Sequence, residues 1–231
     1  MFTLKIADLT IAVSNRYPFT ETLCREYIVP DGTPDFTVSA TDAEIAAESD
    51  GDSYEIGYLE SLALYRKIAE AALDYGAFLL HGVVADMRGT GIAFLAPSGV
   101  GKSTHALNWR RTFGEDFRVI NGDKPLVRFL DGVLYAYGTP WAGKEGVQLN
   151  ARTPLQKLCF IERAETNSAE ALPAREIFDK LSCQVYLPKD SDKLIKTLDL
   201  VDRLIGCCAF YRIRCTKDES SALAAYEVLF S

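Results

Sequence analysis

The chain has 231 residues, of which 48% are hydrophobic and 25% are charged, a composition typical of a folded protein rather than a disordered one. Its formal net charge of −7 argues against binding along a nucleic-acid backbone, because lysine and arginine supply most of that affinity. No apolar run approaches the roughly 20 residues that span a bilayer, and Met1–Lys5 does not begin a signal peptide. We therefore expect a cytoplasmic protein with neither membrane nor nucleic-acid partners.

The number and spacing of the cysteines and histidines argue against a fold that depends on disulfides or on zinc. The six cysteines contain no CxxC pair, and several lie in apolar runs, so we expect reduced thiols that pack in the interior. His81 and His105 are the only histidines, too few for a typical structural zinc site.

The first fifty or so residues predict a small β-rich unit. Apolar and polar positions alternate around 4–6, 11–13 and 36–38, and Pro, Gly and Asp mark exposed turns at 30–35 and 48–53.

A single amphipathic helix is expected to follow this unit. Apolar residues recur at helical spacing from Tyr58 to Tyr75, and Gly76 stands where a helix C-terminal glycine belongs. We predict a domain over 1–75, made of the β-rich unit and this linking helix, and a second domain over 76–231.

The second domain opens with a predicted hairpin. An apolar strand over 78–85 is followed by a short turn at 88–91 and another apolar strand over 91–95, which implies antiparallel pairing. Strands before phosphate loops are usually joined by helical crossovers, so this hairpin indicates a mixed sheet. The expected fold class is α/β. Further strands are expected at 117–120, 125–130, 133–137, 158–161 and 210–215, with helices around 177–181, over 194–205 and from Glu219.

A phosphate-binding loop follows the strand 91–95. Gly99 and Gly101 let the backbone turn its N–H groups inward at the start of the next helix, where the helix dipole also favours an anion. Lys102 would reach the outer phosphates, and Ser103 would supply a hydroxyl to Mg²⁺. The predicted nucleotide-binding residues of the loop are Ser98, Gly99, Val100, Gly101, Lys102, Ser103 and Thr104. Ala96 replaces the usual first glycine, which is tolerable if its φ is negative.

Three other clusters carry candidate site residues. Asp123 follows the strand 117–120 and would hold Mg²⁺ or accept a proton, although Asn121-Gly122-Asp123 also suits a hairpin turn. His81 lies in an apolar strand, where a histidine satisfied by backbone is an alternative. Lys144 sits in a glycine-rich loop that would contact phosphate or act as a lid, unless it is an ordinary exposed loop.

These residues resemble the HPr serine kinase/phosphorylase family, which is related to phosphoenolpyruvate carboxykinase. The resemblance covers roughly 78–230 and is carried by the His81-Gly82 strand, the phosphate loop, Asp123 and the Thr139–Lys144 loop. It is closer to the short HPr-kinase-like proteins, some of which modify peptides. It implies a mixed-sheet kinase core, ATP with Mg²⁺, and phosphate transfer to a serine-type hydroxyl, with His81 as a site residue.

One departure from that family concerns the acid after the strand. The bacterial enzyme has two adjacent aspartates there, whereas this chain has Gly122-Asp123, so Asp123 would have to serve as base or as metal ligand. We predict an ATP-dependent kinase with Asp123, His81 and Lys102 as catalytic residues, Ser103 and Asp123 as metal ligands, and Lys144 on the nucleotide. The acceptor would be a hydroxyl of a peptide, protein or small molecule, and a homo-oligomer stays possible. The alternatives are a nucleotide hydrolase or switch, and a non-catalytic nucleotide-binding module.

Overall fold

The structure is a computed structural model that describes residues 1–30, 32–49, 51 and 53–231. The predicted turns at 30–35 and 48–53 each include residues outside this described part. No helix of the described part is long and apolar enough to cross a membrane. The cysteines are all free, but Cys183 and Cys207 are exposed, so the prediction of buried thiols is wrong for these two.

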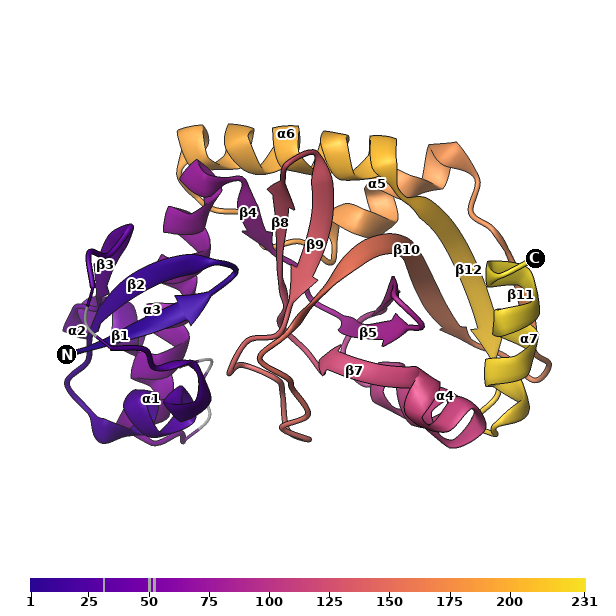
Figure 1. Cartoon of the computed structure of the whole chain (residues 1–231), viewed down its shortest axis with the longest axis horizontal. Coiled ribbons are helices and arrows are strands. Elements are labelled where there is room, and N and C mark those ends of the chain that lie inside the picture. The colour runs from indigo at the N-terminus through magenta and orange to yellow at the C-terminus, as the bar shows by residue number, and fades with distance from the viewer. Residues whose placement is uncertain (31, 50, 52) are drawn as a thin grey trace.

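The N-terminal unit is a three-stranded sheet packed on a long helix (Figure 1). Its strands pair in the order β1-β2-β3, with β1 and β2 antiparallel and β3 parallel to β2. Leu4, Ile11 and Val13 are buried against Leu64 and Ile68 of the helix. The elements are β1 (Phe2–Ile6), β2 (Leu9–Ser14), α1 (Pro18–Leu23), β3 (Phe36–Ser39), α2 (Asp42–Ala46) and α3 (Ile56–Ala72).

Two short helices make this unit less β-rich than predicted. Helix α1 begins with Pro18 at its first position, where proline costs no hydrogen bond. Helix α2 begins with a capping box, in which Thr41 accepts from the backbone of Glu44 and the Glu44 side chain accepts from Thr41. The predicted linking helix is confirmed as α3, and Gly76 ends the following turn with a φ of 73°.

The second part of the chain is a curled mixed sheet covered by helices, which agrees with an α/β fold class (Figure 1). Its strands run in the order β4-β8-β9-β10-β6-β5-β7, and β12 pairs with β10 and β11. The strands are β4 (Ala77–Leu79), β5 (Val83–Met87), β6 (Thr90–Leu95), β7 (Phe117–Asn121), β8 (Leu126–Leu130), β9 (Val133–Tyr137), β10 (Arg152–Arg163), β11 (Ser168–Ala171) and β12 (Ala209–Cys215).

Strand β10 joins the two halves of this sheet and is longer than predicted. Its first residues pair antiparallel with β9, and its later residues pair parallel with β6 and β12. The register shifts between Leu155 and Lys157, and such an irregularity bends a strand. The sheet therefore curls along β10.

The strand predicted over 78–85 is broken in two, which corrects the placement of His81 within a strand. Strand β4 pairs with β8, whereas β5 pairs with β6 and β7. A Cβ on Gly82 would lie 2.5 Å from Leu95 Cδ2 and 2.9 Å from the Phe94 carbonyl oxygen, so only glycine allows the chain to pass there. His81 therefore lies at the crossing between the two halves of the sheet rather than in a strand interior.

The topology brings several strand ends to one edge. Strand β5 is antiparallel to both β6 and β7, as the predicted hairpin requires, so β6 and β7 are parallel to each other. Strand β10 is also parallel to β6. The carboxyl ends of β6, β7 and β10 and the start of β5 consequently meet at one edge, where α/β sheets place their ligands.

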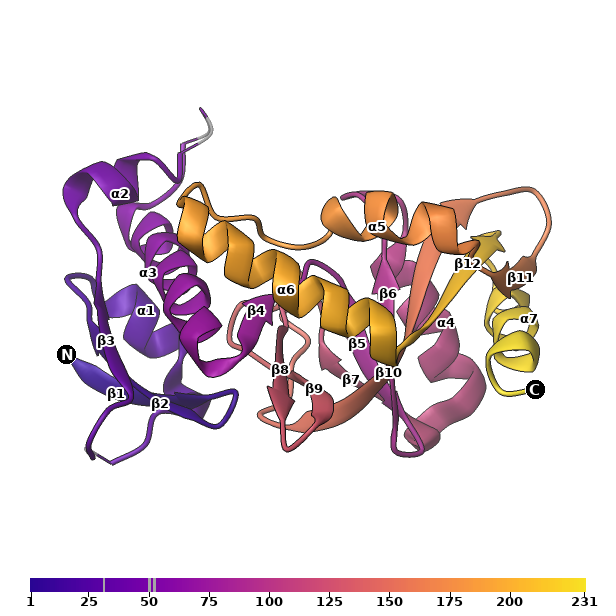
Figure 2. The same ribbon diagram turned by 90° about the horizontal axis from the view of Figure 1, so that it is seen from above.

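Helices cover both faces of this sheet. Phe94 and Ile92 of β6 face α4 and α7, while Ala93 and Leu95 face α5 and α6. Helix α6 crosses the sheet toward the N-terminal unit (Figure 2), where Lys193 binds Glu70 of α3 at 2.6 Å. The helices are α4 (Lys102–Phe113), α5 (Ala174–Ser182), α6 (Ser191–Cys207) and α7 (Ser220–Leu229), so α6 continues through Gly206, where its end was predicted.

A buried histidine under α4 gives the fold a pH-dependent stability. The Trp109 indole donates to His105 Nε2 at 2.9 Å, so that nitrogen carries no proton, and burial lowers the pKa of His105 to about 4. Between pH 6.5 and 4 the unfolded chain binds a proton here that the folded chain does not. Lowering the pH through this window is expected to reduce the free energy of unfolding by on the order of 3 kcal/mol.

Urea denaturation of the wild type and His105→Gln at several pH values measures this effect. The variant is expected to show a flatter dependence on pH, whatever its absolute stability, and His81 is present in both proteins. Equal slopes would exclude His105 as the source.

Candidate functional site

The loop predicted to bind phosphate lies between β6 and α4, so the expected order of strand, loop and helix is confirmed. Gly99 and Gly101 have φ values of 78° and 128°, which residues with a Cβ rarely adopt. Helix α4 begins at Lys102, so the unpaired N–H groups of its first turn and its positive dipole end face the loop. Ala96 is not among the residues with positive φ, and alanine therefore fits the position of the usual first glycine.

The Lys102 side chain points back over the loop. Its ammonium donates to the Ala96 carbonyl at 2.8 Å and lies 3.3 Å from His81 Nε2. Burial lowers the pKa of Lys102, and the negative charge of Asp123 offsets only part of this effect. The lysine is held inside the site rather than on the surface.

Asp123 and His81 meet next to this lysine. His81 Nε2 lies 3.4 Å from Asp123 Oδ1. Burial raises the pKa of Asp123, but the His81 hydrogen bond and the charges of Lys124, His81 and Lys102 outweigh it, so the pKa lies below its ordinary value. Asp123 is therefore a carboxylate at neutral pH, and His81 lies between it and Lys102.

Asn121, which the sequence analysis did not propose as a site residue, shapes the Asp123 turn. Its side-chain oxygen accepts from the backbone N–H of Asp123 at 2.9 Å and of Lys124 at 2.8 Å. Its amide nitrogen donates to the Thr139 carbonyl at 3.0 Å, and the residue is completely buried. This role could have been predicted from the sequence, because asparagine side chains tend to hydrogen-bond the backbone two residues further along the chain.

The loop over 138–149 packs directly on this turn. A Cβ on Gly122 would lie 2.9 Å from the Ala142 carbonyl oxygen and 3.2 Å from that of Val147. A Cβ on Gly143 would lie 2.9 Å from Asp123 Cβ. A second aspartate at position 122 has no room here, because the loop occupies the space that its side chain would need.

The far end of the same loop is attached to the N-terminal unit. The Tyr27 hydroxyl donates to the Gln148 side chain, and Asn150 donates to the Glu26 carbonyl at 2.9 Å. Closer to the site, the Trp141 indole stacks on Tyr65 with ring centroids 4.0 Å apart. The loop thus contacts both the turn of Asp123 and the N-terminal unit.

One cavity of about 840 Å³ contains the predicted site residues. Every predicted residue except Val100 lines it, and these are His81, Ser98, Gly99, Gly101, Lys102, Ser103, Thr104, Asp123 and Lys144. Residues that the sequence did not single out also line it, among them Lys124 and Glu145.

Arg163 at the end of β10 supports the phosphate loop from outside the cavity. Its Nε donates to the Val100 carbonyl at 2.9 Å, and its guanidinium also donates to the Gly99 carbonyl. No local pattern identifies such a residue, because the contact depends on the parallel pairing of β10 with β6.

The oxygen atoms in this cavity suit Mg²⁺ better than a metal ion that is held by protein side chains alone. No cluster of three or more His, Cys, Asp or Glu side chains able to hold a metal occurs among the described residues. Ser103 and Asp123 nevertheless offer oxygen atoms to the same cavity. Mg²⁺ commonly uses one or two protein oxygens together with substrate phosphates, so this pair suits it.

No family model matches this chain, and no curated protein matches it either. Among solved structures, it is similar to the Hpr(Ser) kinase/phosphatase from Coxiella burnetii, at 14% sequence identity and a TM-score of 0.31. The match covers 55% of this chain and 90% of the other. The functional argument therefore rests on the site itself.

Proposed function

We propose that this protein is a kinase that transfers the terminal phosphate of ATP to a hydroxyl group of a second substrate. The observation that supports this most is the cavity that joins the predicted phosphate loop to the partly buried carboxylate of Asp123. A loop alone would serve a switch or a motor equally well. A carboxylate at the adjacent strand end adds the group that phosphate transfer to an alcohol needs.

In this proposal the nucleotide phosphates bind the loop from Ser98 to Thr104, with Lys102 on the outer phosphates. Ser103 and Asp123 are the residues that would hold Mg²⁺, which neutralises charge on the phosphates when it is bound. Lys144 supplies a further positive charge from the loop over 138–149. His81 positions Asp123 through the contact between Nε2 and Oδ1.

The proposed reaction is a direct transfer of the γ-phosphoryl group from ATP to the acceptor hydroxyl. The acceptor oxygen forms a bond to the γ-phosphorus, and the bond from that phosphorus to the β–γ bridging oxygen breaks. The bridging oxygen keeps the electron pair and leaves as part of ADP, while the acceptor proton passes to the Asp123 carboxylate. The lowered pKa of Asp123 keeps it unprotonated and ready for this role at neutral pH.

Replacing Lys102 with methionine tests the nucleotide half of the proposal. A hydrogen bond to a charged group is worth about 1.5–3 kcal/mol, so ATP is expected to bind about 10- to 150-fold more weakly. Calorimetric titration with a non-hydrolysable ATP analogue and Mg²⁺ measures the affinity. Lys5→Met is the matched control, since Lys5 is exposed on β1 and does not line the cavity. Undiminished affinity in Lys102→Met would contradict the assignment.

Transfer of labelled phosphate from ATP to mixed serine peptides and small alcohols tests the reaction itself. Release of phosphate without any acceptor would indicate a hydrolase. Thermal stabilisation by ATP with no turnover would indicate a binding module, because a ligand of the folded state raises stability by mass action.

A further inference from the structure

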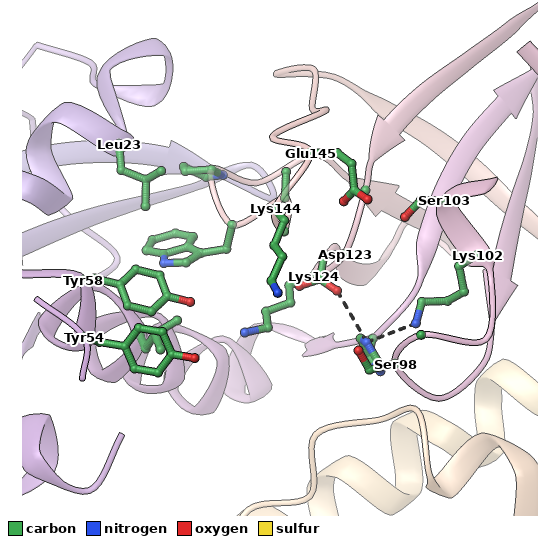
Figure 3. A pocket seen from close by; sticks show the side chains of 18 of the residues that line it. Leu23, Tyr54, Tyr58, Ser98, Lys102, Ser103, Asp123, Lys124, Lys144 and Glu145 are labelled. Atoms are coloured by element: carbon green, nitrogen blue, oxygen red, sulfur yellow. Dashed lines mark hydrogen bonds and ion pairs between the residues drawn. The ribbon is translucent and has the colours of Figure 1, made fainter. Parts of the chain in front are cut away.

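The cavity continues past Asp123, away from the phosphate loop, into a second compartment that we call the aromatic end. Figure 3 shows Tyr54, Tyr58 and Leu23 on the opposite side of Asp123 from Lys102. The aromatic end is lined by Phe19, Leu23, Tyr54, Tyr58, Leu62 and Trp141. Most of these residues belong to α1 and α3 or directly precede α3, so the N-terminal unit supplies the wall of this compartment.

This wall is built from rings that support one another. Tyr58 contacts Phe19 edge to face at 5.9 Å between centroids and Tyr54 at 5.3 Å. The Trp141 indole is fixed by a hydrogen bond to the Ser61 carbonyl at 3.1 Å. Phe19 and Tyr54 remain 36% and 45% exposed, although they lie in a cavity that is continuous with the phosphate loop. Exposed aromatic surface in such a place favours an apolar or aromatic ligand group.

Lys124 adds a positive charge where the aromatic end meets Asp123. It directly follows Asp123, is half-buried, and extends its amino group toward the side of Tyr54 and Tyr58 (Figure 3). Among the described residues, Lys124 has no carboxylate within ion-pair distance, and its charge acts on the neighbouring Asp123 from farther away. A half-buried ammonium at this position favours a ligand with a negative charge, because pairing offsets the cost of removing the charge from water.

The geometry of phosphate transfer indicates which substrate would occupy the aromatic end. The terminal phosphate is placed by the loop, and the attacking hydroxyl must approach it in line from the side of Asp123. The rest of the acceptor then extends toward Lys124 and the aromatic wall.

We propose that the aromatic end and Lys124 form the acceptor site, and that the acceptor is an alcohol carrying both an anionic group and an aromatic or branched apolar group. This inference rests on the kinase function proposed above. The anionic group pairs with Lys124, and the apolar group packs on Tyr54, Tyr58 and Phe19.

Two dyes of similar shape test the site without any knowledge of the natural acceptor. 8-Anilino-1-naphthalenesulfonate is anionic and aromatic, and N-phenyl-1-naphthylamine is its neutral counterpart. Both are titrated by fluorescence with ADP and Mg²⁺ at saturation, so that the phosphate loop is filled. We expect the anionic dye to bind together with ADP. Lys124→Gln is expected to weaken the anionic dye about tenfold and leave the neutral dye unchanged.

Control variants separate the parts of the site. Tyr54→Ala is expected to weaken both dyes, and Lys5→Gln neither. ATP affinity, measured by calorimetry, is expected to stay within twofold in all three variants. Equal binding of the anionic dye to wild type and Lys124→Gln would overturn the proposal. Displacement of the dye by ADP, or a parallel loss of ATP affinity in Tyr54→Ala, would also overturn it by assigning the aromatic end to the nucleotide.

These results are independent of the kinase test. A protein that binds the anionic dye as expected but transfers no phosphate to any alcohol retains the ligand site and refutes the kinase function. A protein that transfers phosphate but binds both dyes alike in wild type and Lys124→Gln retains the kinase function and refutes the acceptor class.

Discussion

Replacing Asp123 with asparagine is expected to lower kcat for phosphate transfer by about 10²- to 10⁴-fold, the range typical of a lost general base. Asparagine keeps nearly the same shape but cannot take the proton of the acceptor hydroxyl. The affinity for ATP, measured without Mg²⁺ and without turnover, is expected to change far less, since Lys102 and the loop from Ser98 to Thr104 are intact. The measurement is single-turnover transfer from labelled ATP onto whichever acceptor supports the wild type.

Asp116→Asn is the matched control for this substitution. Asp116 is exposed and pairs with Arg88 at 2.6 Å, so its loss is expected to leave kcat within twofold. Wild-type turnover by Asp123→Asn would remove Asp123 from the reaction.

The lowered pKa of Asp123 gives a further prediction for the wild type. Its kcat is not expected to fall with decreasing pH until the pH is below about 4, because the pKa lies under the ordinary value of 3.8 and the carboxylate stays ionised at any higher pH.

Replacing Gly138 with alanine is expected to lower the free energy of unfolding by about 3 kcal/mol, the upper end of the usual cost of overlap in a packed interior. A Cβ on Gly138 would lie 1.8 Å from the Leu149 carbonyl oxygen and 2.8 Å from that of Ile120. Both atoms are backbone, so no side-chain rotation relieves the overlap. The two ends of the loop that covers Asp123 would have to separate.

Urea denaturation measures this loss, and Gly206→Ala provides the control. A Cβ on Gly206 meets no atom within 4 Å, and Gly206 lies inside α6. Alanine there is expected to be neutral or to stabilise by up to about 1 kcal/mol, because it favours helix over the unfolded chain. A Gly138→Ala protein as stable as the wild type would show that the loop is not packed as described.

The strand, loop and helix around the predicted phosphate site could be predicted because their signal is local. An apolar strand, two glycines and a breaker-free helix follow one another within 25 residues of sequence, and the structure places β6, the loop and α4 in that order. The turn at Asp131-Gly132 was predictable for the same reason, since both residues take positive φ. The capping box of α2 is an equally local signal, carried by Thr41 and Glu44, and it indicates a helix within the unit predicted to be β-rich.

The position of His81 was not predictable from local pattern. Residues 78–85 are uniformly apolar on both sides of it, and nothing nearby shows that β4 pairs with β8 while β5 pairs with β6. The break depends on long-range pairing and on the lack of space beside Gly82. Arg163 was not predictable for a related reason, since it donates to backbone atoms of Gly99 and Val100 that only the folded sheet brings near, whereas the contacts of Asn121 with Asp123 and Lys124 are local. The division at residue 75, the oligomeric state and the roles assigned to individual site residues stay predictions.

The attachment of the loop over 138–149 bears on how such a protein can change during evolution. The loop packs on the turn of Asp123, and its last residues are also held by Tyr27 and Glu26 of the N-terminal unit. The first 75 residues are therefore not an interchangeable accessory that could be swapped to recruit a new substrate. A replacement unit would also have to bind the loop over 138–149 that packs on the turn of Asp123. We therefore expect new substrate specificity in related chains to arise by substitution of residues in the aromatic end rather than by domain exchange.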